Sequence, residues 1–185
     1  MADIPNVLRL RKKHGRGAPR SATAADGARL VADQSLPGAI IAGLVAIVVF
    51  CFFWVALTAL LDRVLPWLTI LLGAMVGLAV QRAGRGVGWR HPLLAAVLTI
   101  AGALIANVVL AAATTADIFD TATLHIIRAV TSMTWPVFFD EVMTAADAFY
   151  AVFAAALAAF LANRRLTRSQ YFALRLWRAE SDGHH

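Results

Sequence analysis

The chain has 185 residues, of which 60% are hydrophobic and only 15% are charged. Soluble domains average about 45–50% apolar and 25% charged residues, so this composition excludes an ordinary soluble domain and indicates lipid as the solvent for much of the surface. Basic residues outnumber acidic ones by 17 to 11, and the single cysteine, Cys51, excludes an intrachain disulfide bond. Arginine is strongly preferred to lysine and alanine is abundant, a pattern typical of a GC-rich bacterial coding sequence.

Residues 1–35 are polar and basic and lack sustained hydrophobic periodicity, which predicts a largely flexible tail. Its segment Val7–Arg16 is strongly basic, and two interpretations stay open for it. In the first, the segment adheres to anionic lipid headgroups, with a binding free energy of about 1 kcal/mol per basic residue near the surface. In the second, it determines the orientation of the chain in the membrane and does nothing further. We do not expect nucleic-acid binding, because the tail lacks interleaved aromatic residues and a folded module.

Four long apolar runs follow, at about 37–61, 67–81, 92–113 and 137–162. A hydrocarbon core about 30 Å thick needs about 20 helical residues to cross, so each run predicts a transmembrane helix. We therefore expect an all-α, integral membrane four-helix bundle in residues 36–163. A basic helical extension and tail, 164–185, follows, and its modest apolar stripe suits either the membrane surface or a protein partner. His184 and His185 resemble a tag remnant.

The basic residues are distributed unevenly about these runs. Seven lie in the N-terminal tail, three lie between the second and third runs, and five lie in the C-terminal tail, whereas Arg63 and Arg128 alone lie on the other side. Cytoplasmic loops carry an excess of Lys and Arg. The distribution therefore predicts a multi-pass protein of the bacterial inner (plasma) membrane with both termini in the cytoplasm.

Small residues recur at a spacing of four in the apolar runs. Gly73 and Gly77 form a GxxxG pair in the second run, and Gly102 and Ala106 repeat the spacing in the third. Such faces let helix backbones approach closely in lipid. Packing within the chain and contact with a second copy or partner both fit the pattern. Asn107 should face another helix, because an unbonded carboxamide in lipid is costly.

The turn Gln81–His91 interleaves three glycines with Arg82, Arg85 and Arg90. Backbone N–H groups and guanidinium forks of this kind can hold a phosphate, although the turn matches no nucleotide-binding motif. Together with Arg164 and Arg165 after the last run, these arginines are candidate contacts for anionic lipid. The interpretation that we favour is a flexible cytoplasmic turn, with its arginines facing the headgroups and Trp89 as an anchor.

Between the third and fourth runs, apolar residues recur at helical spacing on one face and polar residues recur on the opposite face. We expect an outer amphipathic helix at about 117–134, lying in the membrane interface. The fourth helix should then start at Pro136 and place Asp140, Thr144 and Asp147 on one face. Asp147 would lie inside the outer boundary, where an ionisable residue suggests a functional site.

The acid at Asp147 has two interpretations. In one, Asp147 binds a proton or a cation, with Asp140, His125 and Arg128 as neighbours. In the other, it is an ordinary carboxylate that the positive N-terminal end of a helix favours. We expect no metal site and no cofactor, because neither has a ligand-spacing signature in the sequence.

No catalytic motif stands in the sequence, so we expect no enzymatic activity. The leading hypothesis is a non-catalytic integral membrane subunit or scaffold that stabilises or assembles a larger bacterial inner-membrane complex. Its partners would be anionic bilayer lipid and other membrane subunits or further copies of itself, without nucleic acid. The alternative is a small oligomeric channel or a proton- or cation-coupled transporter that uses Asp147.

Overall fold

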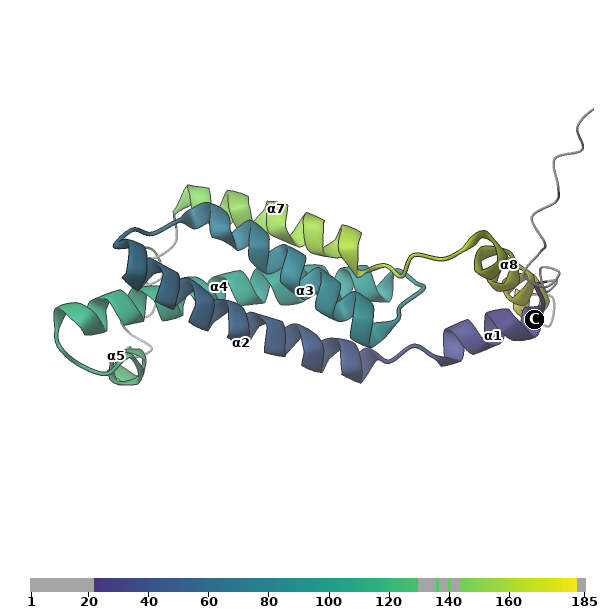
Figure 1. The fold of residues 1–185 in the computed structure, drawn as a ribbon, viewed down its shortest axis with the longest axis horizontal. Coiled ribbons are helices and arrows are strands. Elements are labelled where there is room, and N and C mark those ends of the chain that lie inside the picture. The colour runs from purple at the N-terminus through teal and green to yellow at the C-terminus, as the bar shows by residue number, and fades with distance from the viewer. Residues whose placement is uncertain (1–21, 130–135, 137–139, 141–143, 183–185) are drawn as a thin grey trace, which may run out of the picture. The chain divides into compact units, whose positions relative to one another are not determined.

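A computed structural model describes residues 22–129, 136, 140 and 144–182. Within them all regular structure is helical, as the sequence predicts (Figure 1). In chain order the elements are α1 (Ala24–Ala32), α2 (Leu36–Leu61), the 3-10 helix η1 (Pro66–Leu68), α3 (Thr69–Gly84), α4 (Arg90–Ile118), α5 (Thr123–Ala129), α7 (Ala145–Ala162) and α8 (Arg168–Asp182). The chain divides into two compact units, one of Leu30–Arg165 and the other of the residues before and after it.

The described residues of the larger unit contain four helical segments that are long and apolar enough to cross a membrane: α2, η1 with α3, α4 and α7. Their number confirms the prediction from the four apolar runs. Local signals set where the first one starts, because the Ser35 hydroxyl accepts a hydrogen bond from the Gly38 N–H at 3.1 Å and Pro37 occupies the first turn. Proline suits that position because its missing N–H would have no helical partner there.

Apolar side chains lie both inside and outside this unit. Its interior is filled by large residues, among them Phe50, Trp54, Leu72, Val76 and Val80, all of which are at most 1% exposed. Other large apolar side chains point outward, and Phe52 of α2 is 75% exposed. An outer surface rich in such residues suits lipid rather than water as the surrounding solvent.

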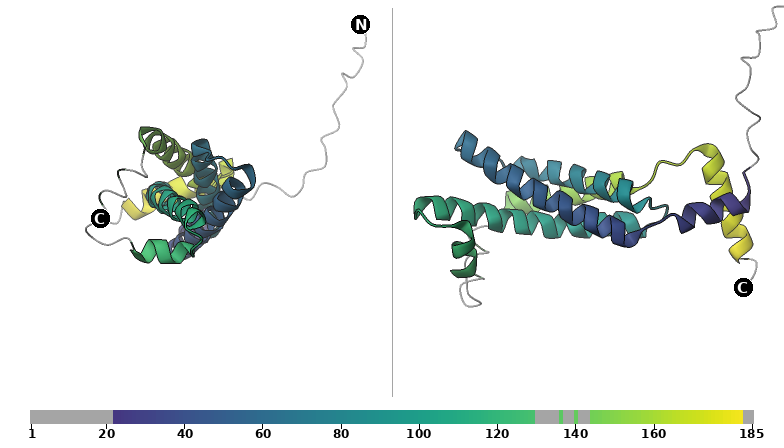
Figure 2. Two further views of the ribbon diagram at one scale, coloured as in Figure 1. Left: turned by 90° about the vertical axis from the view of Figure 1, so that its left-hand side faces the viewer. Right: turned by 60° about the horizontal axis from the view of Figure 1, so that its bottom comes forward.

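Helices α3 and α4 each pack against both α2 and α7 and against one another, and the two views of Figure 2 show the spans gathered in one bundle. Helices α3 and α7 come into backbone contact. Gly73 lies against the main chain of Ala154, and a β-carbon at Gly77 would lie 2.8 Å from the carbonyl oxygen of Ala158. Small residues therefore allow backbone contact between helices that are far apart in sequence.

The chain between the third and fourth spans differs from the prediction. Helix α4 runs on to Ile118, beyond the expected end at 113, because the stretch Ala111–Ile118 is rich in alanine, the best helix former, and contains no glycine or proline. Asp120 then adopts a left-handed conformation, with φ of 49°. Of the expected interfacial helix 117–134, positions 117 and 118 belong to α4, and α5 is the one separate helix among its described residues. Positions 130–134 of that expected helix lie outside the described residues.

The fourth span starts later than Val137. Thr144 has extended dihedral angles, and α7 begins at Ala145, so a single helix 137–162 is wrong at its start. The remaining expected positions 137–139 and 141–143 lie outside the described residues. At its other end α7 stops at Ala162, where the sequence predicts the end of the span, because Asn163 is extended.

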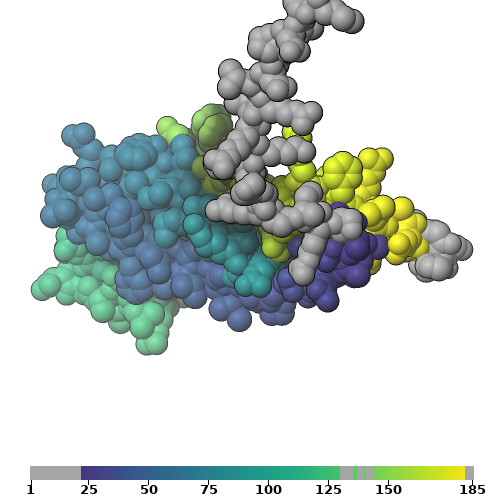
Figure 3. All heavy atoms as spheres, turned by 45° about the vertical axis from the view of Figure 1, so that its right-hand side comes forward, coloured from purple at the N-terminus to yellow at the C-terminus, as the bar shows by residue number. Residues whose placement is uncertain are grey.

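The smaller unit brings α8 onto the first part of α1 (Figure 3). Helix α1 lies within the tail 1–35, which we expected to be largely flexible, and residues 1–21 of that tail lie outside the described residues. Both helices begin at a capping box. Thr23 and Asp26 exchange hydrogen bonds before α1, and Thr167 and Gln170 do so before α8. Such boxes satisfy the free N–H groups of a helix start.

Candidate functional site

The turn that joins α3 to α4 is bound to two other segments of the larger unit. The Ser35 N–H, just before α2, donates a hydrogen bond of 3.0 Å to the Gly84 carbonyl. The Arg164 N–H, just after α7, donates one of 3.1 Å to the Gly86 carbonyl. The start of α2, the end of α3, the start of α4 and the end of α7 therefore meet at one end of the unit.

Two further hydrogen bonds strengthen the same junction. The Gln81 side-chain amide donates to the Asn163 carbonyl at 2.6 Å, and the Val87 N–H is 3.5 Å from the side-chain oxygen of Gln34. The turn is therefore held to the segments before α2 and after α7, which argues against the expectation of a flexible turn.

His91 fills the space behind this turn. Its side chain is 1% exposed, and it lies against Gly84 and Gly86. A β-carbon at Gly84 would lie 2.7 Å from His91 Cδ2, and one at Gly86 would overlap the ring. The glycines are thus required by contact with the imidazole. Neither ring nitrogen makes a hydrogen bond of good geometry among the described residues, although the Gly84 backbone lies beside the ring. Sequence reasoning missed this role, although the close spacing of glycines before a histidine was visible.

Five arginines surround the junction, and they are the ones singled out from the sequence. Arg82, Arg85, Arg90 and Arg165 are exposed, and Arg164 is half-buried. One terminal nitrogen of Arg164, Nη1, is buried without a partner among the described residues. No ion pair neutralises these five side chains within the described part of the chain. Unpaired guanidinium groups can bind phosphate through two parallel hydrogen bonds.

Asp147 has a local structural role. Its carboxylate accepts hydrogen bonds from the N–H and the hydroxyl of Thr144, and its own N–H donates to the Thr144 hydroxyl oxygen at 3.2 Å. The pair forms a capping box at the start of α7, and Asp147 is 6% exposed. The signal that could have found it is the sequence TAAD at 144–147, which also stands at the capped start of α1, 23–26.

The other members of the expected acid site are not brought to Asp147. Asp140 is exposed and precedes the extended Thr144, so the two acids do not share a face of one helix. His125 and Arg128 are exposed on α5. Among the described residues, no hydrogen bond or ion pair connects either of them to Asp147.

The small residues of the spans lie inside the larger unit. Gly73 and Gly77 face α7, Gly102 faces Ile47 of α2, and Ala106 is 1% exposed. Asn107 is buried as expected, but its amide donates to the Ala103 carbonyl of its own helix at 3.0 Å rather than to another helix. These faces are therefore occupied by contacts within the chain.

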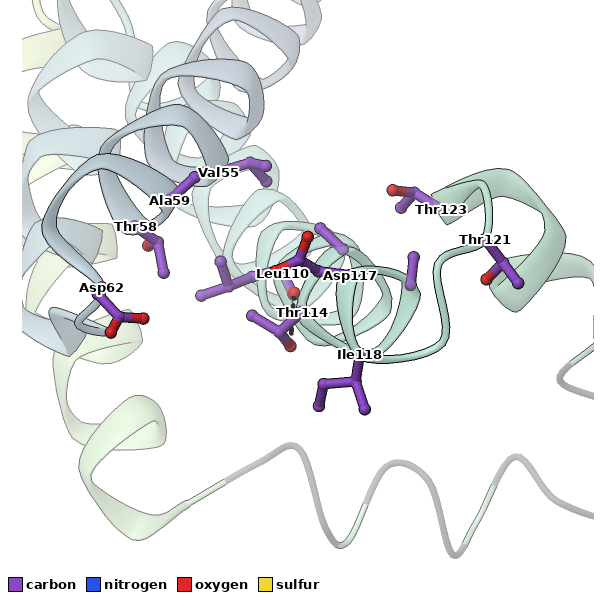
Figure 4. Close-up of a pocket in the computed structure, with 12 residues that line it drawn as sticks. Val55, Thr58, Ala59, Asp62, Leu110, Thr114, Asp117, Ile118, Thr121 and Thr123 are labelled. Carbon is purple, nitrogen blue, oxygen red and sulfur yellow. Dashed lines mark hydrogen bonds between the residues drawn. The ribbon is translucent and has the colours of Figure 1, made fainter.

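A pocket of about 650 Å³, lined by both apolar and polar side chains, lies between the last turns of α2 and α4 and the start of α5. Figure 4 shows Thr58 and Asp62 across from Thr114 and Asp117. Thr58 is 8% exposed, and its hydroxyl has no partner among the described residues. Within that part of the chain, no group of three His, Cys, Asp or Glu side chains could hold a metal ion. The pocket was not anticipated, because its residues are distant in sequence.

Comparisons of the chain with protein-family models, curated proteins and solved structures gave no match. Its function is therefore argued from its own residues.

Proposed function

We propose that the chain is a non-catalytic subunit of the bacterial inner membrane, a four-helix bundle that stabilises or assembles a larger membrane complex. The observation that carries this proposal is the filled interior of the four spans. Large apolar side chains occupy the centre, and glycines bring α3 and α7 into backbone contact. A single copy with such a core leaves little internal volume for a permeation path.

The proposed orientation places both termini in the cytoplasm. Fifteen of the seventeen basic residues lie in the two tails and in the turn between α3 and α4. That turn is hydrogen-bonded to the start of α2 and to the end of α7, so it lies at the end of the larger unit where the chain enters α2 and leaves α7. An excess of Lys and Arg marks the cytoplasmic side.

We also assign anionic phospholipid as a partner of the basic end. The five arginines Arg82, Arg85, Arg90, Arg164 and Arg165 lie around a turn that is tied down by hydrogen bonds. A fixed turn presents its charges at less entropic cost than a flexible one. Native mass spectrometry of the purified chain should show bound anionic lipid, and charge-removing substitution of these arginines by glutamine should reduce it.

The subunit role is tested in the native membrane. Deletion of the chain should lower the amount of one assembled membrane complex on a native gel, and re-expression of the wild type should restore it. Purification of the tagged full chain should recover members of that same complex in fixed proportion. The proposal fails if the chain purifies alone as a symmetric oligomer that conducts ions in liposomes.

The alternative is a small oligomeric channel or a proton- or cation-coupled transporter. The pocket with Asp62 and Asp117 favours it, because two carboxylates beside threonine hydroxyls can attract a cation. Asp147 supports it less, because that carboxylate is engaged in the capping box of α7. Flux that falls in Asp62→Asn or Asp117→Asn proteoliposomes, but not in Asp140→Asn ones, would favour this alternative.

A further inference from the structure

Helix α8 uses one face to contact the first part of α1. Ala173 and Leu174 are 1% and 4% exposed. Gly27 of α1 lies against the Ala173 carbonyl, and a β-carbon there would lie 2.7 Å from Cβ of Trp177. Residues 173, 174 and 177 fall at the spacing of one helix face, so this face of α8 is already occupied.

The opposite face of α8 is exposed, and no contact with another described residue explains its composition. We call it the outward face, and it comprises Arg168, Tyr171, Phe172, Arg175 and Leu176. Tyr171, Phe172 and Leu176 are 59%, 57% and 47% exposed, and both arginines are exposed as well. Phe172 and Leu176 lie one turn apart, with the two arginines beside them. Apolar side chains of this size are rarely left in water together without a partner.

Chain length restricts what can cover this face. Helix α8 follows α7 after a link of only five residues, Asn163–Thr167, which can span about 18 Å at most. If α7 crosses the membrane, as proposed above, α8 must begin close to the headgroups at the end of that span. The capping box of Thr167 and Gln170 fixes the start of α8 immediately after the link.

We propose that the outward face of α8 adsorbs to the anionic surface of the membrane that α7 crosses. Aromatic and aliphatic side chains would enter the boundary between headgroups and acyl chains, while Arg168 and Arg175 bind the phosphate groups. The pattern is that of an interfacial amphipathic helix, in which charge and buried apolar area act together. A protein partner would have to supply acidic residues opposite both arginines, and its presence is a different outcome of the test below.

The test places a fluorescent label at single cysteines of the full chain in the Cys51→Ala background. Phe172→Cys and Leu176→Cys report on the outward face, Glu180→Cys is an exposed control elsewhere on α8, and Phe52→Cys is a control in the span α2. The protein is reconstituted in vesicles of equal parts phosphatidylcholine and phosphatidylglycerol that carry quencher-labelled lipid. We expect strong quenching at 172, 176 and 52 and weak quenching at 180.

Charge is tested separately. The double substitution Arg168→Gln and Arg175→Gln should lower the equilibrium constant for adsorption of α8, followed by quenching at residue 172, about 30-fold. That factor corresponds to about 1 kcal/mol for each arginine near the surface. Quenching at 172 as weak as at 180 would overturn the proposal and would favour a protein partner, while strong quenching at 52 would leave the membrane assignment intact. Equal quenching at 172 in pure phosphatidylcholine would overturn the anionic specificity. Weak quenching at 52 would instead contradict the proposed membrane function itself.

Discussion

Gly73 of α3 lies directly against the main chain of Ala154 of α7, with no room between them for a β-carbon. One turn later, Gly77 repeats the contact at Ala158. In lipid the hydrophobic effect does not hold helices together, so close packing and weak backbone contacts must do so. This contact therefore determines how closely the second and fourth spans approach.

Gly73→Ala should lower the free energy of unfolding by about 1–2 kcal/mol. The alanine gains up to about 1 kcal/mol of helix propensity, but it must push two main chains apart, and overpacking costs about 1–3 kcal/mol. Unfolding by denaturing detergent, followed by tryptophan fluorescence, measures the change.

The matched control is Gly102→Ala. The three atoms nearest to a β-carbon at position 102 would all belong to the side chain of Ile47, with Cγ1 at 2.8 Å, and a side chain can move where a backbone cannot. We expect its stability to stay within about 0.5 kcal/mol of the wild type. Equal losses in both variants would show that the contact with Ala154 has no special role.

Much of the fold follows from the sequence. Run length alone predicts the four spans, and the spacing of Gly73 and Gly77 predicts close packing. The sequence could not decide whether those glycines meet another part of the same chain or a second copy, because a small-residue face suits both. Only the contact with α7 separates the two interpretations.

The candidate site was less predictable. The arginines around the turn are visible as charge in the sequence, but their junction depends on hydrogen bonds between residues as distant as Ser35 and Gly84. The pocket beside Asp117 likewise needs the ends of two helices to meet. Asp147 was interpreted from its depth in an expected continuous helix, and the extended Thr144 removes that premise.

Asp147→Ala should lower the free energy of unfolding by about 1 kcal/mol, the usual cost of losing a helix cap. Thr144→Ala should cost a similar amount, and the double variant should cost little more than either one, because both residues belong to one capping box. Denaturation in detergent micelles measures all three. Asp140→Ala, at an exposed position, should have almost no effect, and a loss there equal to that of Asp147→Ala would contradict the assignment.

Thr58→Val should raise the free energy of unfolding by about 1 kcal/mol, because it removes a buried hydroxyl that lacks a partner. Thr99→Val is the matched control. Thr99 is fully buried in α4, and its hydroxyl donates to the Ala95 carbonyl at 2.7 Å, so its loss should cost about 1 kcal/mol. Destabilisation by both substitutions would indicate that something in the pocket binds the Thr58 hydroxyl.

Gly86→Ala should loosen the junction at the basic end, because its β-carbon would overlap the buried ring of His91. The turn must then move and weaken the hydrogen bond from the Arg164 N–H. Hydrogen exchange should become faster at residue 164. Gly88→Ala, in the same turn, meets nothing within 4 Å and should leave that exchange rate unchanged. Slow exchange in both variants would show that the His91 contact does not hold the junction.

Arg85 combines a strained backbone with a charge that we propose binds anionic lipid, and the two can be separated. It ends α3 in the left-handed region, with φ of 48°, a conformation that costs a residue with a β-carbon about 1 kcal/mol relative to glycine. Arg85→Gly should therefore be more stable than Arg85→Ala by about that amount. Both variants remove the same guanidinium group, so both should lose the same share of bound anionic lipid in native mass spectrometry. If lipid retention instead followed stability, being higher in the glycine variant, the fold of the turn rather than the Arg85 charge would govern lipid binding.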